Sequence, residues 1–294
     1  RWHTPDLAAL LTLFAANREA IERAVYGGFW GGLLHRVRHV LNANTRAGSR
    51  RNIAAHYDLG NAFYALWLDP TMSYSAAHFA GDDGRSLEAA QVAKYVRILD
   101  RLRAKPGQHI LEIGCGWGGL MEIAARDYGC RVTGLTLSRE QRDFAQARMA
   151  RLGLADRVSI ELRDYRDVTG SFDHVVSIEM YEAVGERYWP AYFRVLHDRL
   201  KPAGSAVIQA ITIDERYFDR YRAGTDFIQQ YVFPGGMLAS PSRIRAEAGR
   251  AGLDVGHAYA FGLDYAETLR RWRARFMERV ADVRALGHSD AFVR

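Results

Sequence analysis

The stretch that most constrains the fold runs from His109 to Gly119 and reads HILEIGCGWGG. An aliphatic segment leads into Glu112 and then into a turn dense in glycine, and the residues that follow have helical spacing. A strand, a glycine turn and a helix in this order leave bare backbone at the carboxyl end of a parallel strand, where a nucleotide-like ligand can lie. The sequence therefore predicts a ligand-binding turn on an α/β fold.

Two ligands compete for this turn. It satisfies the Gly-x-Gly-x-x-Gly pattern of dinucleotide sites, which alone is a weak signal. Such a site also needs an acidic residue about 20 residues further on, at the end of the second strand. The second expected strand runs instead into Thr136, and the acid, Glu112, stands before the first glycine. This arrangement favours S-adenosylmethionine (SAM) over NAD.

The composition limits the class of protein. No apolar run reaches the roughly 18 residues of a membrane span. A length of 294 residues with 48% apolar content suits one α/β domain plus a smaller appendage. Two cysteines cannot build a metal site alone, so we expect no metal, no structural disulfide and a reducing, cytoplasmic setting. The first residue is Arg1, so we expect upstream residues to have been lost or removed.

The charge points to an acidic or phosphorylated surface. The net charge is +6, and lysine occurs only at positions 94, 105 and 201, so arginine supplies nearly all of the positive charge. The planar fork of arginine suits phosphate in lipid head groups or nucleic acid, and solvated surface charge explains the excess equally well. We expect no nucleic-acid partner.

Two parts follow from the pattern along the chain. Residues 1–52 form a basic helical N-terminal piece, with Thr4 as the cap of its first helix and a short basic amphipathic stretch at 33–41. That stretch can lie on an anionic membrane or pack on its own domain. Residues 53–294 form the α/β domain, which carries a lid or insertion at 212–240.

Strands and helices alternate through this domain, which indicates a mostly parallel sheet with helices on both faces. The strands are expected at 109–113, 131–135, 158–162, 173–178, 205–211 and 255–261. The helices are expected at 86–103, 119–128, 138–152, 186–200 and 242–251, with a further one through Trp272 and Val280.

Several blocks in order resemble the cyclopropane-fatty-acyl-phospholipid synthase family, which includes the mycolic acid cyclopropane synthases. The blocks are HYDLGN at 56–61, LDPTMSYS at 68–75, LEIGCGWGG at 111–119, GLTLS at 134–138, DYRD at 164–167, SIEMYE at 177–182 and FPGG at 233–236. The resemblance covers roughly residues 52–280. It implies a Rossmann-like class I SAM-dependent methyltransferase that adds a methyl carbon across a cis double bond in an acyl chain.

The resemblance also implies where SAM would bind. Its expected contacts are Tyr74, Ser75, Gly114, Gly116, Thr136, Gln141 and Tyr165, and the same motifs add Glu112, Gly118 and Asp164. Ser138 and Gln141 have the spacing of a helix capping box as well. Thr136 stands where a ribose-binding acid would be, so we expect its hydroxyl and Gln141 to replace that acid. Tyr165 also has an interpretation as a plain core residue.

The chemistry makes demands of its own. An alkene is a poor nucleophile, so it must be held in line with the sulfonium methyl group in a dry site. Methyl transfer leaves a carbocation, which desolvated aromatic faces stabilise by roughly 0.5–2 kcal/mol each. The aromatic candidates are Tyr64, Trp67, Tyr74, Phe227, Tyr231, Phe233 and Tyr265.

A base must then remove a proton. In the family that base is a bound bicarbonate, held by a Cys, a Glu, a His, an Ile and a Tyr. Glu182, Ile211 and Tyr265 match this set, whereas Ala76 stands in the Cys position and Gln209 in the His position. A glutamine can donate a hydrogen bond to an anion but brings no positive charge.

Two outcomes therefore stay open. A retained bicarbonate gives a cyclopropane, and without it Glu182 or Glu179 acts as the base and gives a methyl- or methylene-branched chain. We expect the substrate to be the unsaturated acyl chains of membrane phospholipids, with the enzyme peripheral at the inner membrane surface and a homodimer left open. The rival interpretations are a methyltransferase of a soluble small molecule, an NAD oxidoreductase and a non-catalytic membrane-binding relative.

Overall fold

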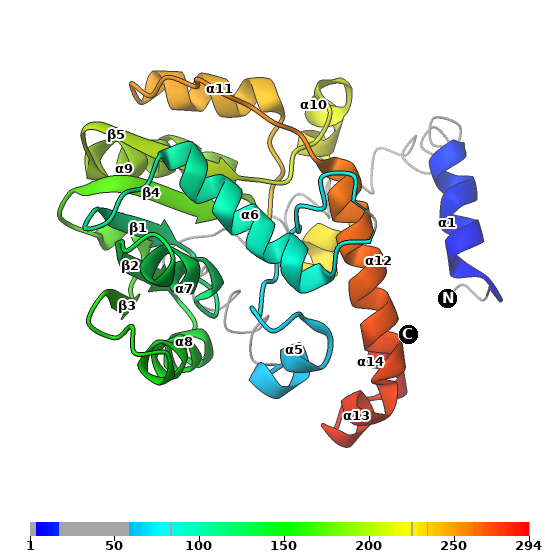
Figure 1. The fold of residues 1–294 in the computed structure, drawn as a ribbon. Helices are drawn as coiled ribbons and strands as arrows, with labels where there is room; N and C mark the ends of the chain where they lie inside the picture. Colours follow the sequence, from blue (N-terminus) through cyan, green and yellow to red (C-terminus); the bar gives the residue numbers. More distant parts are fainter. Residues whose placement is uncertain (1–3, 18–58, 83, 225, 234, 294) are drawn as a thin grey trace.

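The computed structural model describes residues 4–17, 59–82, 84–224, 226–233 and 235–293. Its centre is a sheet of five parallel strands in the order β3-β2-β1-β4-β5 (Figure 1). The strands are β1 (His109–Ile113), β2 (Arg131–Thr136), β3 (Val158–Leu162), β4 (Phe172–Ile178) and β5 (Leu200–Gln209). The structural part of the sequence-based prediction, an α/β fold with a parallel sheet, is confirmed.

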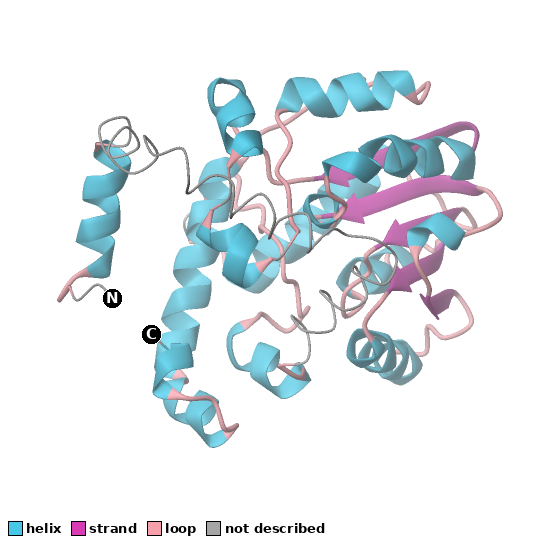
Figure 2. Cartoon of the chain, turned by 180° about the vertical axis from the view of Figure 1, so that it is seen from behind, coloured by secondary structure: helices cyan, strands magenta, loops and turns pink. Residues whose placement is uncertain are grey.

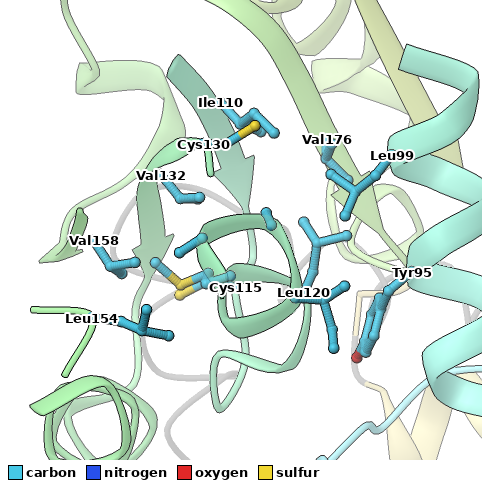
Figure 3. Close-up of a cluster of buried hydrophobic side chains, with 14 of the residues drawn as sticks. Tyr95, Leu99, Ile110, Cys115, Leu120, Cys130, Val132, Leu154, Val158 and Val176 are labelled. Atoms are coloured by element: carbon cyan, nitrogen blue, oxygen red, sulfur yellow. The ribbon is translucent and has the colours of Figure 1, made fainter. Parts of the chain in front are cut away.

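Alternation along β1 explains why helices cover both faces of the sheet. Ile110 packs with α6 (Leu87–Leu102), α7 (Gly119–Arg126) and α8 (Arg139–Arg151), and Figure 3 shows part of this cluster. The next residue, Leu111, points to the opposite face and packs with α9 (Trp189–Arg199) and α11 (Pro241–Arg250). Figure 2 shows the sheet between these helices from behind. A sheet buried on both faces holds its strand ends in fixed positions.

A third cluster lies beyond the carboxyl ends of the strands and is rich in aromatic side chains. It joins α5 (Asn61–Trp67), the segment 72–79, α12 (Gly262–Glu278) and α13 (Val280–Ala285). The insertion expected at 212–240 contains α10 (Glu215–Ala223) and a π-helical turn, Ile228–Val232. The last helix is α14 (Asp290–Val293).

Three boundaries differ from the expectation. The segment 255–261 is irregular and largely exposed and adds no strand to the sheet. Its aromatic side chains, Tyr259 and Phe261, pack edge-on against His78 and stack on each other. The fifth strand begins earlier, at Leu200, and ends at Gln209. The first helix, α1 (Leu7–Ala16), is capped by Asp6, whose carboxylate accepts from the Ala9 amide at 3.0 Å, and not by Thr4.

The N-terminal piece is described only in part. Helix α1 stands apart from the sheet in Figure 1, and none of its residues is buried. The boundary between residues 52 and 53 and the basic stretch 33–41 lie outside the described residues.

Candidate active site

The glycine turn after β1 borders open space. Gly114 and Gly116 have φ angles of +83° and +52°, a backbone conformation that residues other than glycine rarely adopt. A Cβ atom built on Gly114 would lie 3.0 Å from Met180 Cγ, whereas one built on Gly116 would meet no atom within 4 Å. The backbone at Gly116 is therefore open to a ligand. Gly118 is the N-cap of α7.

Glu112 lies just before this turn and is 3% exposed. One of its carboxylate oxygens, Oε2, is buried without a hydrogen-bond partner among the described residues. Burial raises the pKa of Glu112 well above its usual value, and the Lys94 ammonium opposes that rise. An orphaned acceptor beside an open backbone fits a ligand that brings its own cationic donor, as the ammonium of SAM would.

The end of β2 carries the hydroxyl and amide expected there. Thr136 Oγ1 donates to Gln141 Oε1 at 2.8 Å, and the Ser138 amide donates to Thr136 Oγ1 at 3.1 Å. Ser138 Oγ accepts from the Gln141 amide and caps α8, which is one half of the expected capping box. The other half is not formed, because the Gln141 side chain bonds Thr136 instead of the Ser138 amide. All three side chains are buried at the same sheet edge as the glycine turn.

Asp164 and Tyr165 follow β3 and have structural partners of their own. The Asp164 carboxylate accepts hydrogen bonds from Arg166 Nε at 2.8 Å and from Arg166 Nη2 at 2.6 Å. Tyr165 packs edge-on against Tyr192, with ring centroids 5.7 Å apart. Both residues lie at the carboxyl edge of the sheet, and contact with SAM stays a prediction for each of them.

The aromatic candidates divide into two groups. Tyr74 lies in the middle of the first, with ring centroids 5.5 Å from Trp67, 5.4 Å from Trp272 and 6.5 Å from Phe233. Tyr64 and Tyr265 pack in the same cluster. Phe227 is 67% exposed, and the side chain of Tyr231 lies outside the described residues.

Trp117 ties the turn to this aromatic wall. Its indole Nε1 donates to Asn61 Oδ1 at 2.6 Å, and its ring lies 5.0 Å from that of Tyr64. The tryptophan of the glycine turn therefore fixes α5 over the ligand-binding edge of the sheet.

Two carboxyl groups follow β4 and collect the N–H donors around them. Glu179 Oε1 accepts from the Ala76 amide at 2.8 Å and from Gln209 Nε2 at 2.9 Å. Glu182 Oε1 accepts from the Ile211 amide, while its Oε2 is buried without a partner among the described residues. The structure thus brings Ala76, Glu182, Gln209 and Ile211 together, as the resemblance implies.

The carboxyl groups are coupled electrically. Desolvation raises the pKa of Glu182 to about 8, and the neighbouring Glu179 adds to the rise. Desolvation also raises the pKa of Glu179, but Lys94 and the two hydrogen bonds oppose the shift. Burial, followed by Glu179 and Glu182, raises the pKa of the Tyr265 hydroxyl, so Tyr265 faces the same pair. Glu179, whose charged form Lys94 and the two donors favour, is therefore the member of the pair that loses its proton more readily.

Sequence reasoning missed Lys94 and Gln91, which hold the segment between the two halves of the site. Lys94 is 2% exposed, and its Nζ donates to Ser75 Oγ at 2.5 Å. Gln91 Nε2 donates to the Ser75 carbonyl at 2.9 Å. A signal was present, because both residues fall on the apolar stripe of the helix expected at 86–103.

Two further findings concern the described residues only. No group of three His, Cys, Asp or Glu side chains is placed to hold a metal ion. None of the described helices combines the length and the apolar content needed to cross a membrane.

Comparison with known proteins gives consistent matches. The family model for mycolic acid cyclopropane synthetase matches residues 44–294. The chain is 40% identical to the tuberculostearic acid methyltransferase UfaA1 of Mycobacterium tuberculosis, over all of this chain and 70% of that protein. It is 39% identical to the cyclopropane-fatty-acyl-phospholipid synthase of Escherichia coli, over 81% of this chain and 59% of the relative.

A solved structure agrees with these matches. The mycolic acid cyclopropane synthase CmaA1 complexed with SAH and CTAB superposes with a TM-score of 0.76 and is 31% identical. The match covers 83% of this chain and 88% of that one. The shared architecture is that of class I SAM-dependent methyltransferases.

Proposed function

Because the chain belongs to the mycolic acid cyclopropane synthetase family, we propose that it is a SAM-dependent methyltransferase acting on the double bond of an unsaturated acyl chain. One observation carries the proposal. A glycine turn open at Gly116, an aromatic wall around Tyr74 and the coupled carboxyl groups of Glu179 and Glu182 meet at one edge of the sheet. The turn and the carboxyl groups come close at Met180, next to Glu179, because a Cβ atom built on Gly114 would lie 3.0 Å from Met180 Cγ.

SAM fits the described residues. The open backbone at Gly116 and the orphaned Glu112 oxygen would receive it, with Gln141, Tyr74 and Ser75 bordering the same edge. When bound, SAM would supply a methyl group from its sulfonium sulfur, and the sulfur would keep the electron pair of the S–C bond that breaks. The chain contributes position and a water-poor surrounding, which matter most for a weak nucleophile such as an alkene.

The aromatic wall suits the charge that develops on the acyl chain. The ring centroid of Tyr74 lies 5.5 Å from that of Trp67 and 5.4 Å from that of Trp272. Faces of this kind stabilise a desolvated cation by roughly 0.5–2 kcal/mol each. The carboxyl groups of Glu179 and Glu182 face Tyr265 of the same aromatic cluster, and a carboxylate there can accept the proton that must leave.

The substrate that we propose is an acyl chain esterified in a membrane phospholipid. Large apolar side chains are exposed along the insertion and at the start of α12, including Phe227 at 67%, Ile228 at 48% and Leu263 at 88%. The net charge of +6 favours an anionic surface. We therefore place the protein at the cytoplasmic face of the membrane, bound peripherally. The E. coli relative is named for a phospholipid substrate and the mycobacterial one for tuberculostearic acid.

The test is to identify the methylated product. The protein is incubated with SAM labelled in its methyl group and with vesicles of dioleoyl phosphatidylglycerol, and the released fatty acids are analysed by mass spectrometry. We expect the label in a ring or a branch at the former double bond. Label found only in water-soluble products, with SAM still bound, would instead support a methyltransferase of a soluble small molecule.

A further inference from the structure

Glu179 has an unusual backbone conformation. Its φ angle is +47°, in the left-handed region that residues other than glycine rarely occupy. Such strain persists only when the surroundings hold it, and it is concentrated at functional sites. Here the surroundings are the two donors on Oε1, the Ala76 amide and Gln209 Nε2. The backbone strain thus places a carboxylate where three segments of the site meet.

Those donors are the ones that a bicarbonate would need. Of the five positions implied by the resemblance, Ala76, Gln209 and Ile211 offer N–H groups. Ala76 and Gln209 donate to Glu179, and Ile211 donates to Glu182. A bicarbonate there would find its donors taken and would lie against the Glu179 carboxylate, whose negative charge opposes the binding of an anion. The residues present do not fit a bound bicarbonate.

We propose that the Glu179 carboxylate takes the place that the resemblance gives to bicarbonate and accepts the proton that leaves the methylated acyl chain. This inference rests on the proposed function. In the step a C–H bond of the methylated cation breaks and the proton passes to a Glu179 oxygen. The electron pair stays on the chain, where it closes the ring or, after a hydride shift, forms a carbon–carbon double bond. No oxidant, reductant or external base is needed.

The surrounding charges select Glu179 over Glu182 as the acceptor. Lys94, on α6, is the cation that favours the ionised form of Glu179. The neighbouring Glu179, by contrast, raises the pKa values of Glu182 and Tyr265. Both hydrogen bonds that the Glu179 carboxylate accepts from the described residues fall on Oε1, which leaves Oε2 without one. A carboxylate that keeps one oxygen free of hydrogen bonds, beside a cation that favours its charged form, suits a proton acceptor.

The experiment compares the wild-type protein with Glu179→Gln and Glu179→Gly in carbonate-free buffer, with and without added bicarbonate, on the phospholipid vesicles described above. The wild type is expected to give the same rate within about twofold in both buffers. Glu179→Gln is expected to lose at least about a hundredfold in rate while its Kd for SAM stays nearly unchanged. Glu179→Gly frees the donors of Ala76 and Gln209, so added bicarbonate is expected to restore part of its activity. Glu186→Gln, a change at an ion pair with Arg222 outside the site, is the control.

Titration calorimetry with sodium bicarbonate gives a readout that does not depend on turnover. Heat of binding to Glu179→Gly but not to the wild type supports the proposal, even if that variant forms no acyl product. A wild type that binds bicarbonate, or loses most of its rate when carbonate is removed, overturns it. Full activity of Glu179→Gln overturns it as well. A wild type that binds SAM but methylates no acyl chain under either condition contradicts the proposed function, and with it the role of Glu179 as proton acceptor.

Discussion

The Lys94 ammonium lies 2.5 Å from the Ser75 hydroxyl, inside a site that also holds the carboxyl groups of Glu112 and Glu179. Burial lowers the pKa of Lys94 to about 8, and the carboxylates, Glu179 first, oppose that fall. A buried cation beside several buried acids is favourable only while they compensate one another. Lys94 therefore sets the charge state of the SAM side and of the acyl side of the site together.

Replacing Lys94 by methionine should move the pH dependence of turnover. Lys94 lowers the pKa values of Glu179 and Glu112, so its removal should raise both. We expect the acid limb of the pH–rate profile to shift upward by about one unit or more. The measurement is the product formed between pH 5 and 9 with saturating SAM. Lys201→Met, which removes a half-exposed ion pair with Asp173, should leave the profile where it is.

Gly116→Ala should weaken SAM binding with only a small loss of stability. The added Cβ meets no protein atom within 4 Å, so the cost to the apo protein is the left-handed backbone alone, about 1–2 kcal/mol. Gly153→Ala carries the same kind of strain, at φ +68°, in equally open surroundings away from the turn. Calorimetry should therefore show at least a tenfold weaker Kd for Gly116→Ala and an unchanged Kd for Gly153→Ala. Equal affinities in the two variants would remove the turn from the SAM site.

Glu182→Gln should flatten the dependence of stability on pH. Burial raises the pKa of Glu182 from its ordinary value of 4.5 to about 8 in the folded protein, so between these pH values the native state binds more protons than the unfolded state. Stability from this group is thus fully present at low pH and is lost as the pH rises through about 8. Thermal unfolding should show the Tm of the wild type falling between pH 5 and 8 by a few degrees more than that of the variant. Parallel curves would mean that Glu182 is not held protonated.

The sequence predicts the parts of this site that depend on local pattern. The turn after β1, the edge position of Thr136 and the capping of α8 by Ser138 follow from residues within one turn of each other. The charge pairing does not, because Lys94 and Glu179 are far apart in the chain and meet only through packing of α6 on the sheet. The prediction of a strand at 255–261 is wrong for a similar reason. Tyr259 contacts His78 and Arg97, and these tertiary contacts override the local preference of the segment for a strand.

The last prediction concerns the membrane surface. Leu263 lies at the start of α12 and is 88% exposed. It is two residues before Tyr265, which faces the site. An apolar side chain at the rim gains free energy when it enters a bilayer, about 25 cal/mol for each Å² removed from water. Leu263→Asp should therefore bind vesicles of dioleoyl phosphatidylglycerol several-fold more weakly in a flotation assay while its Kd for SAM is unchanged. Leu152→Asp, at the end of α8 and 40% exposed, is the matched control, and an equal loss in both variants would point to added negative charge instead of a specific contact with lipid.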